Sequence, residues 1–366
     1  RPGFTLTQRG NALTEWEENK STNIGLDVVL FSGKLSAVFD WYTRNIEGLL
    51  IQATLPGTAG AATPAFTNVA SMENNGWDLA LNWRSQINNT IGLTLGLNLT
   101  HYKNKITNID GGSNSFFPVG IDSRFGLVNI NQLNYPISSF YGFQTDGIFQ
   151  DAADVAGHAT QDGAAPGRMK FKDITGDGIV DNADRGPTGS PHPDLTLGFN
   201  IGLDYKQFDF TMFLYGSFGN EIFNYNKIFH DFRLFNTNIV EDRLTNSWTP
   251  ENTGAKYPRL DASDSYSRVP SDYYLENGSF LRARTVSIGY NITPSKSIGF
   301  SKLRVYIQGQ NLFTITDYSG IDPDLSNVNV GQADGQGRKN NDQWTGFDFG
   351  NYPSSRVYMI GVNATF

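Results

Sequence analysis

The residues with the clearest chemistry are the acidic side chains of a short segment that runs from Asp173 to Asp184. Oxygen-bearing groups recur along it at loop positions 1, 3, 5, 7, 9 and 12: Asp173, Thr175, Asp177, the backbone carbonyl of Ile179, Asp181 and Asp184. Gly178 stands at position 6, where the calcium loop of an EF-hand turns sharply. Carboxylates this close repel one another unless a cation neutralises them. The spacing therefore predicts a structural calcium ion that stiffens this loop.

Two substitutions depart from the usual calcium-loop pattern. Thr175 stands where Asp or Asn is usual, and Asp184 replaces the Glu that ligates through both oxygens. The flanking sequence also lacks the pattern of two helices. The alternative interpretation is a solvated turn rich in Asp and Gly, which needs no metal.

Other kinds of site chemistry find little support. The chain has no cysteine, which excludes disulfides, thiolate metal sites and thiol nucleophiles. Its four histidines lack the spacing of a zinc protease, and no Gly-x-Ser-x-Gly element is present. The net charge of −8 provides no basic surface for a nucleic acid. We therefore expect neither an enzyme nor a nucleic-acid-binding protein.

The elements that must position the acidic segment are strands. Only 17% of the 366 residues are charged, and 39 are glycine. From Ile91 to Thr100 apolar residues alternate strictly with Gly, Thr and Asn, which is the period of a two-faced strand. The same alternation recurs in nine segments: 22–31, 35–44, 77–84, 91–100, 195–204, 208–218, 286–292, 303–310 and 356–366.

Each segment is about ten residues long, which is the length that a tilted strand needs to cross a bilayer. One face is apolar and the other is small or polar, with aromatic residues such as Trp41, Trp77, Trp83, Tyr205 and Phe208 near strand ends. These features favour an all-β, antiparallel transmembrane barrel over a soluble sandwich. An odd number of strands does not close cleanly, and an open sheet has unpaired edges that a bilayer does not tolerate. We therefore expect a fragment of a larger barrel, or half of a barrel built from more than one chain.

The connections alternate between short and long, which is typical of outer-membrane barrels. If the short turns are periplasmic, Phe366 lies on the periplasmic side and Asp173 to Asp184 on the outer side. The long connection 104–193 holds two further extended pieces, near 138–149 and 168–173, which would be either two more spans or none. A short capped helix is expected from about Ile239 to Ser247.

Two larger groups of side chains are candidates for function. Charged residues on the polar face could pair across strands, hold a plug, or simply line a hydrated lumen: Asp27, Asp40, Arg44, Asp78, Arg84, Asp204, Asp209 and Arg304. Aromatic residues of the outer loops could contact cargo or a partner protein, or pack within the loops: Phe229 to Phe235, Tyr266, Tyr273, Tyr274 and Trp344 to Phe349.

Short motifs spread over nearly the whole chain resemble the SusC/RagA-type TonB-dependent transporters of the Bacteroidetes outer membrane. They include Asn74-Asn75-Gly76-Trp77-Asp78, Phe140-Tyr141-Gly142, Phe280-Leu281-Arg282, Gln310-Asn311-Leu312-Phe313 and Gly320-Ile321-Asp322-Pro323. Their order and spacing are similar to those of the C-terminal half of the barrel. We interpret residues 1–366 as this C-terminal portion, with 173–184 as a calcium loop within an extracellular loop.

The resemblance implies a 22-stranded barrel with an N-terminal plug, a SusD-like surface lipoprotein as partner, and energy supplied through TonB. It also implies a multi-pass protein of the outer membrane, in contact with lipid, that imports oligosaccharides or peptides. The plug, the TonB box and the first barrel strands are not in this sequence. The alternative is a secreted, calcium-stabilised, β-rich module that binds carbohydrate or protein.

Overall fold

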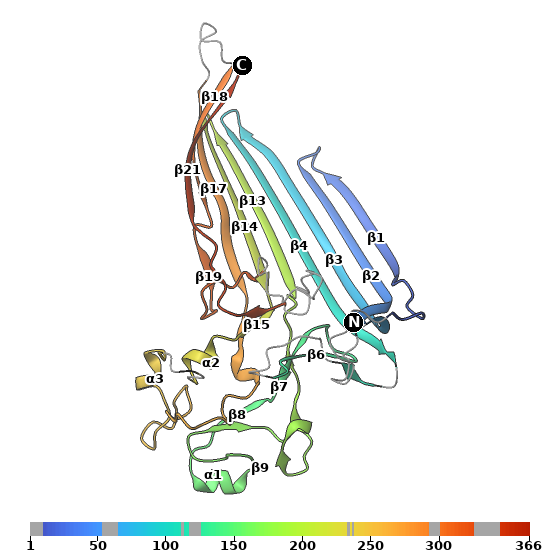
Figure 1. Cartoon of the computed structure of the whole chain (residues 1–366). Helices are drawn as coiled ribbons and strands as arrows, with labels where there is room; N and C mark the ends of the chain where they lie inside the picture. Colours follow the sequence, from blue (N-terminus) through green and yellow to red (C-terminus); the bar gives the residue numbers. More distant parts are fainter. Residues whose placement is uncertain are drawn as a thin grey trace, which may run out of the picture.

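The computed structural model describes residues 10–52, 65–110, 113–116, 126–232, 235, 238–292, 301–325 and 345–366. A ten-stranded antiparallel sheet dominates them, with long curved strands that run side by side (Figure 1). The strands follow one another in chain order: β1 (Glu18–Leu30), β2 (Leu35–Gln52), β3 (Phe66–Asn88), β4 (Ile91–Ile109), β13 (Leu195–Tyr205), β14 (Phe208–Phe218), β17 (Phe280–Ile292), β18 (Lys302–Gln310) and β21 (Val357–Thr365). The tenth strand, β19 (Thr314–Thr316), pairs with the start of β17.

The nine alternating segments of the sequence are the nine long strands of this sheet, which confirms that part of the fold prediction. β2, β3 and β4 continue well past the alternating segments, to Gln52, Phe66 and Ile109, on the side of the long connections. Within the described part of the chain the sheet stays open, with β1 and β21 at its two edges.

The long connections fold into a separate body at one end of the sheet, opposite the short turns (Figure 1). Its described residues form four small sheets: β5 (Ser115–Phe116) with β6 (Asn129–Gln132), β7 (Ser139–Gly142) and β12 (Gly186–Gly189); β8 (Thr145–Ile148) with β10 (Met169–Phe171); β9 (Thr160–Gln161) with β11 (Ile179–Val180); and β15 (Glu221–Asn224) with β16 (Leu275–Asn277) and β20 (Phe347–Asp348). The α-helices among these described residues are α1 (Ala152–Gly157), α2 (Lys227–His230) and α3 (Asp242–Thr245).

The two extra extended pieces expected near 138–149 and 168–173 belong to this body. They form β7, β8 and β10. β8 pairs with β10, and β7 pairs with β6 and β12, so all three belong to the small sheets and not to the large sheet. Strands of three or four residues are far too short to cross a bilayer. Of the two possibilities, the structure therefore shows no additional span there.

The loop body has its own apolar core. Seven buried side chains form it: Val128, Phe140, Phe223, Tyr225, Ile228, Tyr274 and Phe347. Phe223 stacks on Tyr274 with ring centroids 5.3 Å apart, and Phe140 meets Phe347 edge to face at 5.2 Å. Such pairs add about 0.5–1.5 kcal/mol each beyond their burial. This core makes the long connections an ordered body.

The helix expected from Ile239 to Ser247 is shorter than predicted. The observed α3 spans only Asp242–Thr245, and the residue before it, Glu241, makes no capping hydrogen bond through its side chain. The chain leaves the helix because Asn246 and Trp248 exchange backbone hydrogen bonds with Tyr257. In the described part of the chain, no helix has the length and apolar character needed to span a membrane.

Candidate functional site

The large sheet has one apolar face and one polar face, and the strand register shows which residues belong to each. Ile24, Trp41, Trp77 and His101 lie opposite one another in one row, and Ile24 and Trp41 are 63% and 42% exposed. The neighbouring row, on the other face, contains Gly25, Asp40, Asp78 and Thr100. An exposed apolar face on a sheet of this size needs a lipid or protein environment.

Two aromatic rows bound the apolar face. The row of Trp41 and Trp77 reaches β4 at His101, and the second row, Tyr205 with Phe208 and Tyr290, reaches β4 at Ile91. These β4 positions are ten residues apart, which is about 33 Å along a strand. At a tilt of about 40° the height between the rows is about 25 Å, the thickness of the apolar band of an outer-membrane barrel.

The polar face carries a hollow of about 640 Å³ on β1 to β4, beside the aromatic row of Trp41 and Trp77. The side chains around it are mostly hydroxyls and amides, with Tyr42, Arg44, Asp78 and Tyr102 among them. Tyr42 lies across Gly76, where a Cβ would come within 2.7 Å of its hydroxyl oxygen. Because a glycine stands at this point of β3, the Tyr42 ring can extend over the strand toward β4.

Hydrogen bonds fix several walls of this hollow. The hydroxyl of Thr100 donates to Asp78 at 2.5 Å, and the Asn104 amide donates to Asn74 at 2.7 Å. The Tyr102 hydroxyl lies 3.2 Å from Nδ1 of His192, whose other ring nitrogen meets the carbonyl of Ile137. The large sheet therefore provides the walls of the hollow, and His192 of the loop body helps to hold Tyr102 in place.

A second hollow of about 480 Å³ lies on β14, β17 and β18, next to a β-bulge. The register between β14 and β17 shifts at Phe213 and Leu214, which leaves Arg284 as an extra residue on β17. Arg284 reaches over the ring of Tyr215 at 5.2 Å and pairs with Asp324. Bulges of this kind often redirect a side chain at the rim of a barrel.

Buried ion pairs hold a loop against this bulge. Arg282, 3% exposed, pairs with Asp322 and with Asp324, the latter at 3.4 Å. The backbone N–H of Ser354 donates to Asp322 at 2.9 Å. In the sequence, Arg282 and Asp322 belong to two separate motifs. Their pairing has no local signal because 40 residues separate them.

Some of the eight charged residues predicted for the polar face have polar partners in the described part of the structure and others do not. Asp209 and Arg304 form an ion pair at 2.5 Å, and Asp78 is held by Thr100. Among the described residues, Arg44 and Arg84 make no ion pair within 4 Å. Of the three alternatives, pairing across strands is confirmed for Asp209 and Arg304. For the other residues of this set, contact with a plug and hydrated lining both stay predictions.

The predicted calcium loop lies in the loop body, and its carboxylates accept hydrogen bonds from the loop's own backbone. Asp173 accepts from Gly176 and Gly178 at 2.6 and 2.8 Å, and Asp177 and Asp181 each accept from the N–H two residues later. Within the described residues, no three acidic or histidine side chains converge closely enough to hold a metal. The calcium ion stays a prediction. If the ion binds, these backbone hydrogen bonds have to rearrange around it.

Asp184, the expected ligand at position 12, is the most deeply placed of these carboxylates. It is 1% exposed and accepts from the N–H groups of Ile174, Thr175 and Asp181. Burial acts to raise the pKa of Asp184, but the hydrogen bonds from Thr175, Asp181 and Ile174 outweigh it, and the pKa is lowered. The ionised Asp184 carboxylate therefore ties residues 174, 175 and 181 of the loop together through hydrogen bonds.

The outer-loop aromatic residues mostly pack inside the loop body. Tyr274 and Phe347 are completely buried, and Tyr273 donates a hydrogen bond to Asp231 at 2.9 Å. Phe235 and Tyr266 are exposed, at 51% and 43%, and Trp344 lies outside the described residues. Of the alternatives, loop packing accounts for the buried members of this set.

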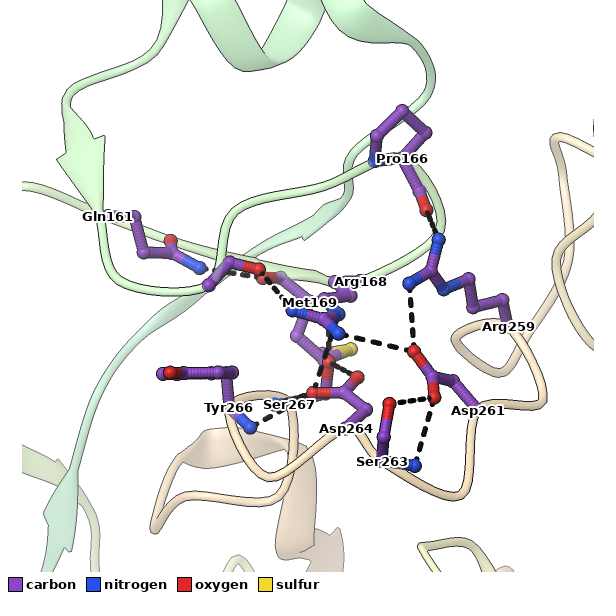
Figure 2. Close-up of polar contacts among 11 residues, drawn as sticks. Gln161, Pro166, Arg168, Met169, Arg259, Asp261, Ser263, Asp264, Tyr266 and Ser267 are labelled. Atoms are coloured by element: carbon purple, nitrogen blue, oxygen red, sulfur yellow. Dashed lines mark hydrogen bonds and ion pairs between the residues drawn. The ribbon is translucent and has the colours of Figure 1, made fainter.

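A network of ion pairs joins two of the outer loops (Figure 2). Arg168 pairs with Asp261 at 3.2 Å and with Asp264 at 3.7 Å, and Arg259 pairs with the same Asp261 at 2.8 Å. Hydrogen bonds from Ser263, then from Arg259, lower the pKa of Asp261. The two loops are thus fixed to each other by ion pairs that meet at Asp261.

Comparison with known proteins assigns the family. The model of the TonB dependent receptor-like β-barrel matches residues 1–215. The chain therefore belongs to this family, whose members are β-barrels of the outer membrane. This assignment places the chain in an outer-membrane barrel rather than in a secreted module.

Several relatives are similar over the whole chain. TonB-dependent receptor P3 of Formosa agariphila is 35% identical over 372 residues, and TonB-dependent receptor SusC of Bacteroides thetaiotaomicron is 26% identical over 374 residues. These matches cover 100% and 99% of this chain but only 36% and 34% of the relatives. The RagAB peptide transporter structure superposes with a TM-score of 0.77 at 24% identity, over 99% of this chain and 36% of that chain, which shows the fold.

Proposed function

We propose that the full-length protein is a TonB-dependent importer that carries oligosaccharides or peptides across the outer membrane. The observation that carries this proposal is the combination of an apolar outer face about 25 Å high with a polar face that bears hollows lined by hydroxyls, amides and arginines. The family assignment supports the same function. We propose no enzymatic activity, because the family assignment supports a transport role.

The relatives support the proposed partners. Similarity to SusC supports a SusD-like surface lipoprotein as partner, and similarity in fold to RagAB, titled a peptide transporter, keeps peptides among the cargoes. The ordered loop body offers the surface on which such a lipoprotein would rest. Energy would come from TonB through a part of the protein that lies outside this sequence.

Uptake of labelled cargo by intact cells tests the proposal. Three strains are compared: one with the full-length gene, one without it, and one with the gene but without TonB. We expect uptake only in the first strain. Equal uptake in the strain without TonB would contradict TonB-driven import. Purification of the receptor from its own membrane should also yield a SusD-like lipoprotein, identified by mass spectrometry.

A further inference from the structure

Arg44 is the cation of the larger hollow on the polar face, and it has no counter-ion among the described residues. It lies on β2, in the row that contains Ser21, Asn74 and Asn104. Resting on the proposed import function, we propose that Arg44 binds a carboxylate of the cargo. The hollow would then be a subsite at the outer mouth of the lumen that distinguishes acidic from neutral cargo.

The nearest acidic groups on the same face do not neutralise Arg44. Asp40 and Asp78 lie opposite each other in one row of the polar face. On that face, the row of Tyr42 lies between them and Arg44. Four residues of strand separate Arg44 from Asp40, which is about 13 Å along β2. Asp78 also accepts a hydrogen bond from Thr100 at 2.5 Å. A charge at the Arg44 end of the hollow is thus left for a ligand.

The groups next to Arg44 suit the remainder of such a ligand. Ser21, Asn23 and the Tyr42 hydroxyl face the hollow, and no hydrogen bond engages their side chains within the described structure. The Asn74 amide is oriented by Asn104 at 2.7 Å. A guanidinium binds a carboxylate through two parallel hydrogen bonds, while the hydroxyls and amides can bind neighbouring hydroxyl or carbonyl groups. Sugar acids and peptide C-termini both present this combination.

The other arginines of the polar face do not offer the same chemistry. Arg282 and Arg284 are paired with Asp322 and Asp324, and Arg304 is paired with Asp209. Arg84, on β3, is exposed and lacks an ion pair in the described structure, but it does not line the hollow. Arg84 is therefore a matched control for Arg44.

The test measures cargo affinity of the full-length receptor, purified with its lipoprotein, for wild type, Arg44→Gln and Arg84→Gln. Four probes are used: a uronic-acid oligosaccharide, the same oligosaccharide with its carboxylates reduced to alcohols, a peptide with a free C-terminus, and the same peptide amidated. We expect Arg44→Gln to weaken binding of one carboxylate probe by about tenfold or more. The uncharged counterpart and the Arg84→Gln protein should be unaffected. Which carboxylate probe responds identifies the source of the carboxylate.

The outcomes separate this inference from the proposed function. Equal binding of charged and uncharged probes by wild type, or equal loss of both in Arg44→Gln, would overturn the subsite and leave import intact. A wild-type receptor that binds none of the four probes would count against both. A third outcome also overturns the subsite: Arg44→Gln lowers the thermal stability of the complete receptor but not its affinity, which would show that Arg44 pairs within the protein.

Discussion

Asp209 on β14 and Arg304 on β18 form an ion pair that crosses the intervening strand β17. The bond is 2.5 Å long, and the two residues lie on strands that each pair with β17 but not with each other. Gly289 of β17 is the residue beneath the pair, where a Cβ would come within 2.5 Å of Nε of Arg304 and of Oδ2 of Asp209. The absence of a side chain at Gly289 lets the pair form.

Gly289→Ala should therefore destabilise the barrel. The methyl group would separate the two charges or displace the strands, at a cost of about 1–3 kcal/mol. Gly198→Ala is the matched control, because a Cβ there would meet its nearest neighbour, the Phe213 ring, at an ordinary 3.5 Å. Denaturant unfolding in detergent measures both. Equal stability of the two variants would contradict the role assigned to Gly289.

Arg282→Met should be more damaging. It leaves Asp322 buried without the arginine that pairs with it and removes one of the two arginines that pair with Asp324. Loss of one partner of a buried pair costs about 3–5 kcal/mol. The exposed Arg356 provides the control substitution Arg356→Met, which should cost less than about 0.5 kcal/mol. The unfolding midpoints of the two proteins in denaturant decide the matter. A wild-type midpoint for Arg282→Met would show that the pairs do not contribute.

The Asp184 carboxylate makes the acidic loop sensitive to low pH. Its pKa is lowered in the folded loop, so its stabilising contribution is complete above the ordinary carboxyl pKa of about 4 and is lost as the pH falls through the lowered value. Hydrogen–deuterium exchange of the Ile174, Thr175 and Asp181 amides measures this contribution, with Asp184→Asn as the reference. At neutral pH wild type should be better protected by about 1–3 kcal/mol. A difference that does not shrink in acid would be inconsistent with this account.

Calcium binding at the same loop is a further prediction. If calcium binds, Asp173 and Asp177 must exchange backbone hydrogen bonds for the ion. Calorimetric titration of the full-length receptor should then show one site, abolished in an Asp173→Asn/Asp177→Asn protein and retained in Asp162→Asn, which alters an exposed carboxylate outside the loop. Absence of binding in the wild type would favour the interpretation as a metal-free turn.

The parts of the fold that were predictable are those with a local signal. Strict alternation from Ile91 to Thr100 defines a two-faced strand without knowledge of its neighbours. The pairing of Asp209 with Arg304 depends on the register of three strands, and Tyr274 is buried by segments from distant connections. Arg44 was predicted to face inward. Only the strand register shows that its neighbours are hydroxyls and amides, and that Asp40 lies four residues away along β2.

The orientation of the chain in the outer membrane is the central claim, and cysteine labelling tests it most directly because residues 1–366 contain no cysteine. Glu251→Cys in the outer loops, Lys34→Cys in a short turn and Leu26→Cys on the apolar face are introduced singly into the full-length receptor, with any cysteine outside this chain removed. A membrane-impermeant maleimide should label Glu251→Cys in intact cells, Lys34→Cys only after the outer membrane is permeabilised, and Leu26→Cys in neither. Labelling of Lys34→Cys but not Glu251→Cys in intact cells would contradict the account.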